Sequence, residues 1–426
     1  MKRKLLGLLL CAAMSVTALA GCGQKGAAST EGGAGGEEKI TLSIYAQYAD
    51  DDTKIPYDYA VEALKEAYPN VELNLIIQAQ DDGATLETLA ATGQLPDIYQ
   101  SNTNIINTFR ETNQIMELDA VAESTGYLNK LMPSNVDLVY SEDGHIYCFP
   151  YAGNEYVLIY YNKALFEQCN LEVPKTYDDL MNCIEVFKAN NIVPMEIMGE
   201  GWIYTALYDI VATRYNNGGV KALDEGTASV ADEDYVKAAE KLSELAKAGL
   251  FQDGCVTTNY DEASAKFLGG EAAMFVNGQW YIPDAEAALG DDVDWMFYPS
   301  YDEASYEANK YAFAGGGSTS GFSVNPDSPN AELAAEVAEF MAEKYCEAKV
   351  LKRGTPLVAL ETGVTPETEY PKMMQKLSET IPSMTSTTKF SWGLSDTKFN
   401  ESITVYAGGL VSGEYTAEEF VSDMTK

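Results

Sequence analysis

The chain has 426 residues, of which 65 are acidic and 28 basic, and its formal net charge is −37. A field of this sign repels polyanions, so we expect no nucleic-acid partner. The 46% hydrophobic content is that of a folded protein, and because single cores stop growing at roughly 250 to 300 residues, two lobes are expected.

The N-terminal segment has the layout of a secretory signal peptide. Basic residues at positions 2–4 precede an apolar run over 5–20, which is short for a transmembrane helix. The run ends in LAGC at 19–22, which resembles the site at which bacterial lipoproteins are cleaved and acylated. We therefore predict a signal peptide over 1–21 and a lipid, including palmitate, on Cys22. An uncleaved membrane anchor is the alternative.

Residues 22–38 are rich in glycine, with Ser, Thr and Glu, and this composition predicts a flexible tether. No later segment has the apolar length of a transmembrane helix, so the chain from Lys39 onward is expected outside the membrane. These features predict a protein on the extracellular face of a bacterial cytoplasmic membrane, attached to the membrane through its N-terminal lipid only.

The first part of the folded chain predicts a βαβ unit. Alternating residues favour a strand over 39–46, helical spacing favours a helix over 57–68, and an apolar strand follows over 71–78. A short helix over 84–91 and a strand over 97–100 come next. This order is typical of a parallel α/β lobe.

A second α/β series follows an extended crossing that contains Pro150 and Gly153. Thr176 is placed to cap a helix that runs to Asn190, with Asp179 reciprocating the bond. The remaining patterns predict strands over 156–162, 192–198, 271–276, 294–298 and 315–324, and helices from Lys163, over 203–215, over 235–248 and from Pro329 to near Tyr345. The last eighty residues are expected to be mostly helical.

The histidine and cysteine content argues against several kinds of site. His145 is the one histidine, so a His-dependent triad or a zinc site with several His ligands is disfavoured, and we interpret it as a surface turn residue. Five cysteines remain beyond Cys22, with no CxxC spacing, and we interpret them as small buried residues. No catalytic residue, metal ligand or cofactor is predicted.

Short motifs occur along the chain in a distinctive order: GQLPDI at 93–98, IYCFP at 146–150, YYNK at 160–163, PKTYDD at 174–179, FLGGEAAM at 267–274 and NGQW at 277–280. Together they resemble the extracellular solute-binding proteins of bacterial ABC sugar importers, the maltose-binding-like group (family 1), in its lipoprotein form. The likeness covers nearly all of residues 39–426.

The resemblance implies a two-lobed α/β fold of the periplasmic-binding-protein-like type II class, with a hinge and a ligand cleft between the lobes. Its expected segments are 39–150 plus 299–352 for lobe 1 and 151–298 plus 353–426 for lobe 2. The chain should cross between the lobes at the three junctions of these segments. The implied partners are membrane permease subunits of an ABC transporter, with a separate ATPase, and the protein is expected to be a monomer.

A pyranose has apolar faces and a polar rim, so a protein that binds it needs aromatic surfaces surrounded by hydrogen-bonding side chains. The resemblance places ligand-stacking aromatics at Trp202, Trp280 and Trp392, with core packing as the alternative, whereas Trp295 on a strand is interpreted as core. Polar candidates are Gln47, Gln100, Ser101, Asn102, Asn154 and Glu200. The whole loop over 47–52 is a further candidate, and its acidic run at 50–52 is interpreted in preference as a solvated cluster.

The sequence therefore predicts a binding protein that captures an oligosaccharide and is not an enzyme. A lipid-anchored glycoside hydrolase is one alternative, with Glu200 as the carboxylate to test. The same fold with a peptide or polyamine ligand is another, since Tyr and Trp can surround a cation. Because the loop after the predicted strand over 97–100 has no aromatic residue before Phe109, a maltose-like specificity is not favoured.

Overall fold

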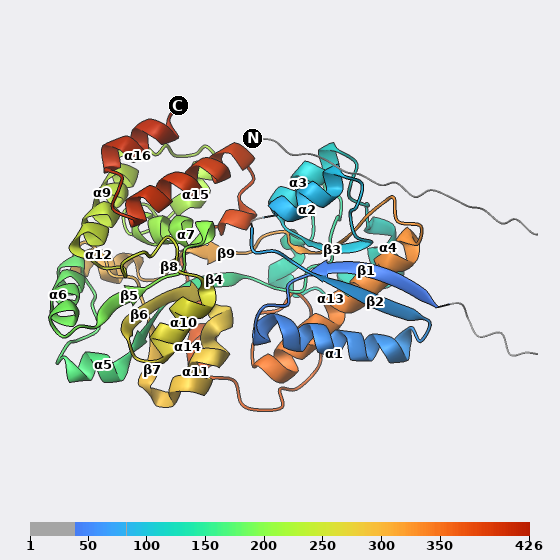
Figure 1. The fold of residues 1–426 in the computed structure, drawn as a ribbon, viewed down its shortest axis with the longest axis horizontal. Helices are drawn as coiled ribbons and strands as arrows, with labels where there is room; N and C mark the ends of the chain where they lie inside the picture. Colours follow the sequence, from blue (N-terminus) through green and yellow to red (C-terminus); the bar gives the residue numbers. More distant parts are fainter. Residues whose placement is uncertain (1–38, 82) are drawn as a thin grey trace, which may run out of the picture. The chain divides into compact units, whose positions relative to one another are not determined.

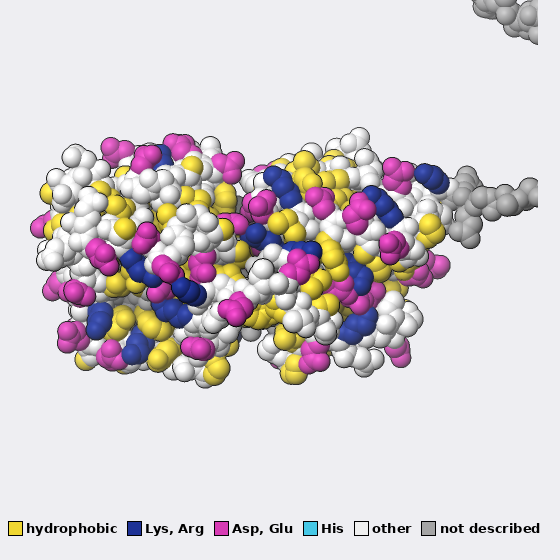
Figure 2. All heavy atoms as spheres, turned by 90° about the horizontal axis from the view of Figure 1, so that it is seen from below, with side chains coloured by type: hydrophobic (Ala, Val, Ile, Leu, Met, Phe, Trp, Pro, Cys, Tyr) yellow, Lys and Arg dark blue, Asp and Glu magenta, His cyan; other side chains and the backbone are white. Residues whose placement is uncertain are grey.

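The computed structural model describes residues 39–81 and 83–426, which form a mixture of helices and strands (Figure 1). The predicted signal peptide over 1–21, the acylation site Cys22 and the tether over 22–38 lie outside the described residues. In the described part of the chain, no helix has both the length and the apolar character needed to cross a membrane. Acidic side chains, with basic ones between them, are spread over the face shown in Figure 2.

The first sheet has the strand order β10-β3-β1-β2. Its strands are β1 (Ile40–Ala46), β2 (Val71–Ile77), β3 (Ile98–Ser101) and β10 (Gly321–Val324). Strand β1 is parallel to both β2 and β3, in a register that sets Ile44 beside Leu75 and Ile98, and β10 is antiparallel to β3. The predicted βαβ unit is confirmed.

Side chains alternate between the two faces of this sheet. Ile44 and Ile98 belong to the first core, which includes apolar residues of α1 (Asp51–Ala67) and α13 (Ala331–Arg353). Tyr45 and Tyr99 point to the other face and pack with residues of α2 (Ala84–Ala91) and α3 (Thr103–Glu111). Helices α1 and α13 lie side by side (Figure 1), and the short α4 (Asp119–Ser124) also packs in the first core.

The second sheet has the order β5-β6-β4-β7, and β9 also pairs with β4. Its strands are β4 (Glu155–Asn162), β5 (Val193–Glu196), β6 (Ala272–Gly278), β7 (Val293–Met296) and β9 (Gly315–Gly316). Every residue of β6 is buried, as expected for a central strand covered on both faces. A smaller pair joins β8 (Ala312–Phe313) to β11 (Ser386–Thr387).

Helices surround this second sheet and share its hydrophobic core, here called the second core. They are α5 (Lys163–Gln168), α6 (Tyr177–Ala189), α7 (Gly201–Ala212), α8 (Gly219–Asp224), α9 (Glu233–Ala248), α10 (Tyr260–Leu268), α11 (Ile282–Leu289), α14 (Lys372–Thr380), α15 (Thr397–Val411) and α16 (Ala417–Met424). Helix α12 (Glu303–Asn309) is tied to this region because Asn309 exchanges hydrogen bonds with Arg214.

Several local predictions can be compared directly with the structure. The capping box of Thr176 and Asp179 starts α6 as predicted, and Trp295 is fully buried in the second core. Helix α1 begins at Asp51, earlier than predicted, because Asp50 caps it in a capping box with Thr53. Helix α13 continues past Tyr345 to Arg353, and Gly354 ends it in a left-handed conformation.

The predicted lobe boundaries remain a proposal, and strand pairing favours one change to them. Strands β8 and β9 fall in a segment that was predicted to belong to lobe 1. However, β8 pairs with β11, β9 pairs with β4, and Phe313 of β8 lies in the second core. We therefore propose that the chain returns to the first lobe after Gly316, rather than near residue 299.

The cysteines and the histidine occupy the predicted environments. Cys148, Cys183, Cys255 and Cys346 are buried, Cys169 is half-buried, and all five are free thiols. His145 is exposed, and its Nδ1 lies 3.4 Å from Glu117 and 3.5 Å from Asp119, which gives a protonated imidazole two carboxylate partners.

Candidate functional site

A cavity of about 690 Å³ is lined by residues of both cores. On the side of the first sheet, the parallel strands β1, β2 and β3 all end at this cavity, which is the edge where open α/β sheets bind ligands. The loops after these strands contribute polar lining residues: Gln47, Asp50, Gln78, Gln80, Asp81 and Asn102. On the side of the second sheet, the lining includes Asn259, Tyr260 and Asp261 at the start of α10.

Three tryptophans from separate segments meet at the cavity. Trp202 lies in the first turn of α7, Trp280 lies in the short 3-10 turn over Gln279–Tyr281 that follows β6, and Trp392 precedes α15. The ring centroids of Trp202 lie 5.7 Å from those of Trp280 and 5.6 Å from those of Trp392, and the latter two are 6.1 Å apart. The structure brings the three predicted residues together in one aromatic cluster, and their stacking on a ligand stays a prediction.

The three rings differ in how much surface they leave open. Trp202 is only 8% exposed and packs in the second core, whereas Trp280 and Trp392 are half-buried. Phe390 stacks on Trp392 at 4.3 Å with an interplanar angle of 8°, which fixes the orientation of that indole. Trp280 and Trp392 thus offer most of the aromatic surface, and Trp202 supports them from behind.

Glu200 orients the innermost indole. It is the N-cap residue of α7, but its side chain makes no capping bond. Its Oε2 instead accepts a hydrogen bond from Nε1 of Trp202 at 2.7 Å. The carboxylate lines the cavity beside the ring, so Glu200 is placed both to hold Trp202 and to accept hydrogen bonds from a ligand.

The predicted polar residues of the first lobe line the cavity and also support its loops. Gln100 Oε1 accepts a bond from the backbone N–H of Gln47 at 2.7 Å, and the Ser101 hydroxyl lies 2.6 Å from that of Ser323. Asn102 caps α3 through Ile105 N–H. The side-chain amide nitrogens of Gln100 and Asn102 have no hydrogen-bond partner among the described residues, so both remain able to donate to a ligand.

Asn154 is the one predicted ligand-binding residue that the structure does not place in the cavity lining. It lies beside Gly317, where an added Cβ would be 2.5 Å from the Asn154 Oδ1. The next residue, Glu155, lines the cavity instead. Neighbouring residues of an extended chain point in opposite directions, so a ligand contact by Asn154 stays a prediction while Glu155 is added as a candidate.

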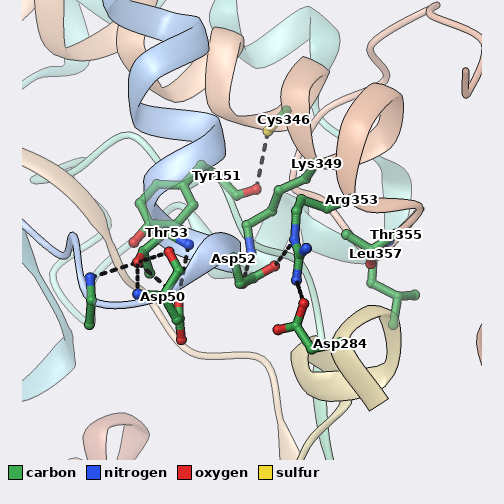
Figure 3. A network of polar contacts seen from close by, with 11 residues as sticks. Asp50, Asp52, Thr53, Tyr151, Asp284, Cys346, Lys349, Arg353, Thr355 and Leu357 are labelled. Atoms are coloured by element: carbon green, nitrogen blue, oxygen red, sulfur yellow. Dashed lines mark hydrogen bonds and ion pairs between the residues drawn. The ribbon is translucent and has the colours of Figure 1, made fainter. Parts of the chain in front are cut away.

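A group of charged residues at the cavity was missed by the sequence analysis (Figure 3). Asp52 is 7% exposed, and its Oδ2 lies 2.7 Å from Nζ of Lys349 on α13. The interpretation of residues 50–52 as a solvated cluster is thus wrong, because Asp50 caps α1 and Asp52 points inward. The sequence did contain a signal for the burial of Asp52. Asp52 precedes Pro56, Ala60 and Leu64 at intervals of four residues, which places it on the buried face of α1.

Glu155 shares this charged end of the cavity with Asp52 and Lys349. Burial raises the pKa of Glu155 to about 7, with Lys349 opposing the rise and Asp52 adding to it. For Lys349 burial lowers the pKa, but the Asp52 carboxylate outweighs burial and the net pKa is raised. Carboxylates outnumber the one lysine in the lining, so the cavity disfavours an anionic ligand.

Comparisons with known proteins agree with this geometry. Residues 59–379 match the family model of bacterial extracellular solute-binding proteins. The multiple sugar-binding protein of Streptococcus mutans is 26% identical over 292 residues, which are 66% of this chain and 66% of that protein. The chain thus matches between 58% and 66% of the length of three of its curated relatives.

Two solved structures share the fold. One, from work on xylan utilization by Caldanaerobius polysaccharolyticus, has a TM-score of 0.79 and 22% identity, and the match covers 90% of this chain and 99% of the other. The second, a chitin oligosaccharide binding protein, has a TM-score of 0.77 and 20% identity, with coverage of 91% and 97%. The predicted two-lobed α/β fold is confirmed.

Proposed function

Because the chain belongs to the bacterial extracellular solute-binding proteins, we propose that it captures an oligosaccharide in the cavity between its two cores and delivers it to an ABC transporter permease. The observation that carries this proposal is the aromatic cluster of Trp202, Trp280 and Trp392, which faces polar side chains across a cavity of about 690 Å³. Flat apolar surface opposite hydrogen-bonding groups suits a sugar ring.

The energetics require both kinds of contact. If each open ring covers roughly 50 Å² of sugar face, burial contributes about 1 kcal/mol per ring at roughly 25 cal/mol/Å². Micromolar capture needs about 8 kcal/mol, so stacking on Trp280 and Trp392 is insufficient alone. Hydrogen bonds of about 0.5 to 1.5 kcal/mol each supply the rest. Gln47, Gln100, Ser101, Asn102 and Glu200 are the proposed partners of the sugar hydroxyls.

The relatives support a carbohydrate ligand. One is named for binding multiple sugars and another for binding chitin oligosaccharide, and a third comes from work on xylan utilization. We infer that closure of the two lobes around the hinge encloses the sugar, as in other two-lobed binding proteins. The permease subunits, with a separate ATPase, then receive the ligand.

We also propose that the chain acts as a monomer and is attached to the membrane through its N-terminus. The LAGC motif at 19–22 supports lipid, including palmitate, on Cys22 after removal of the signal peptide. Attachment by this lipid alone would hold the folded part at the extracellular face of the cytoplasmic membrane. Metabolic labelling with a fatty acid tests this, and Cys22→Ala should abolish the label.

We propose that the protein is not an enzyme, and the rival glycoside hydrolase has a specific test. A pKa of about 7 would suit Glu155 as a general acid. A hydrolase also needs a second free carboxylate across the bond. Asp52 is held by Lys349 and Arg353 and is not free for this role, and the family of the chain is one of binding proteins. Release of shorter sugars from xylotriose or chitotriose, lost in Glu155→Gln, would establish the enzyme instead.

The binding proposal is tested by a calorimetric panel on the folded protein. Xylotriose, chitotriose and raffinose represent sugars, while spermidine and a neutral tripeptide represent the alternative ligands. We expect micromolar affinity for at least one sugar and none for the amine or the peptide. Binding of spermidine or the peptide alone would replace the sugar with a cationic or peptide ligand.

A further inference from the structure

A line of charged side chains runs from the cavity into the boundary between the two cores (Figure 3). Asp52 Oδ2 lies 2.7 Å from Lys349 Nζ, and Asp52 Oδ1 lies 3.5 Å from Nε of Arg353. Arg353 Nη2 in turn donates to Asp284 Oδ1 at 2.8 Å. Asp52 and Lys349 line the cavity, whereas Arg353 and Asp284 are outside its lining.

The last of these contacts joins the two cores. Asp52 lies on α1 and Arg353 is the final residue of α13, and both helices pack in the first core. Asp284 lies in the first turn of α11, whose apolar residues pack in the second core. Tyr345, Lys349 and Arg353 are spaced four residues apart, so one face of α13 carries the lining of the cavity and then this ion pair.

Burial makes the contact strong enough to matter. The side chain of Arg353 is 7% exposed and that of Asp52 is 9% exposed, so water screens their charges weakly. The side chain of Asp284 is 30% exposed. If Arg353 loses the Asp284 carboxylate, part of its buried positive charge is left without a partner. The arrangement of the two cores in which Arg353 keeps both Asp52 and Asp284 is therefore favoured.

The ion pair and a ligand would connect the same two walls. Asp284 follows Trp280 by four residues, at the start of the helix that continues from the aromatic cluster. On the opposite wall, Asp52 is hydrogen-bonded to Lys349, is ion-paired with Arg353 and faces the cavity. A movement of the two walls away from each other would therefore break the Asp284–Arg353 pair and also carry Trp280 away from Asp52.

We propose that Arg353 is a positioning residue for ligand capture, which holds the two walls of the cavity in their binding arrangement by joining Asp52 of the first core to Asp284 of the second. It does so without touching the ligand. The part of this inference that concerns affinity rests on the proposed function. The apparent dissociation constant rises as the fraction of protein molecules in the binding arrangement falls. Loss of the Arg353–Asp284 ion pair therefore weakens binding even when every residue that lines the cavity is intact.

The test removes the partly exposed partner, because loss of the buried Arg353 itself could unfold the chain. Asp284→Asn removes the charge and keeps the shape, and Asp284→Glu restores the carboxylate. The matched control is Asp291→Asn, since exposed Asp291 pairs with Lys372 of α14 on the same core. Each protein is measured by small-angle X-ray scattering without ligand and by calorimetry with the sugar of the panel that binds wild type most tightly.

For Asp284→Asn we expect a larger radius of gyration than wild type without ligand and a dissociation constant at least tenfold higher. Asp284→Glu should return both values toward wild type, and Asp291→Asn should leave both unchanged. A dissociation constant or radius of gyration in Asp284→Asn equal to that of Asp291→Asn overturns the inference. If no sugar binds wild type, the proposed function fails, while the scattering comparison still decides whether the ion pair holds the two cores together.

Discussion

Nε1 of Trp202 donates a hydrogen bond to Oε2 of Glu200, two residues earlier, at 2.7 Å. This bond fixes the indole that supports both Trp280 and Trp392, because all three rings are in mutual contact. The orientation of the open aromatic surface therefore depends on a carboxylate at the N-terminus of α7. Four predictions follow from this arrangement and from the buried charges.

Replacing Glu200 separates its two proposed roles. Glu200→Gln keeps an oxygen that accepts the indole N–H, so we expect at most about a threefold rise in the dissociation constant for sugar. Glu200→Ala removes the acceptor and leaves the Trp202 N–H unpaired, so a rise of at least tenfold is expected. Calorimetry on both variants checks this. Equal affinities in the two variants would show that the bond to Trp202 is unimportant.

Trp280→Ala removes one of the two half-buried indoles that line the cavity. We expect the dissociation constant for sugar to rise at least tenfold, because the lost ring contact is accompanied by a gap beside the ligand. Tyr301→Ala is the control, since Tyr301 is an exposed aromatic residue outside the cavity lining. Thermal unfolding confirms that both variants fold. An unchanged affinity in folded Trp280→Ala would contradict stacking on this ring.

Gly278→Ala tests the same ring without removing it. An added Cβ would lie 2.2 Å from Cζ3 of Trp280, so the indole has to move, although the backbone of Gly278 is in an ordinary extended conformation. We expect weaker sugar binding in Gly278→Ala. In the double variant with Trp280→Ala, the affinity should be no lower than in Trp280→Ala alone. If the losses of sugar affinity in the two single variants add up in the double variant, the effect of Gly278→Ala does not act through the Trp280 indole.

The buried Asp209 on α7 makes stability depend on pH. Burial raises its pKa to about 7, against hydrogen bonds from Thr388 and Val220 N–H that lower it. The unfolded pKa is about 3.9, so between these values the folded state binds one more proton and stability falls as pH rises. The slope is at most about 1.4 kcal/mol per pH unit for this one group.

Asp209→Asn mimics the protonated side chain and should remove this group's contribution. Urea unfolding at pH 5 and pH 8 measures it, and the variant should lose less stability between these values than wild type. Burial also raises the pKa values of Glu155 and Glu339 to about 7. The stability of Asp209→Asn should therefore still fall as pH rises, but less steeply than that of wild type. Identical pH dependence in the two proteins would contradict the raised pKa of Asp209.

The elements with regular periodicity were predictable from the sequence. Strands β1 and β2, helix α2 and the capping box of Thr176 and Asp179 depend on local patterns of period 2 or 3.6, and they lie within a few residues of their predicted positions. The start of α1 was missed because its signal is the side chain of Asp50, in a run of three similar carboxylates.

Individual residues of the candidate site could be named from the sequence. Contacts between residues that are far apart in the chain could not. The three tryptophans were named from their motifs, but their mutual contacts require α7, the end of β6 and the segment at 391–393 to meet in space. The partner of Asp52 is Lys349, 297 residues away, and no local pattern indicates such a pairing. Asn154 was named from its place in the family pattern beside the predicted hinge, and the sequence had no local signal for Glu155, which lines the cavity.

The most direct test is a crystal structure of the protein with the sugar that binds most tightly in the calorimetric panel. We expect a sugar ring parallel to the indole of Trp280 or Trp392, at about 4 Å, with its hydroxyls bonded to side chains of the first lobe. A sugar bound away from both indoles, or a cavity that stays empty while the sugar binds elsewhere, would contradict the account.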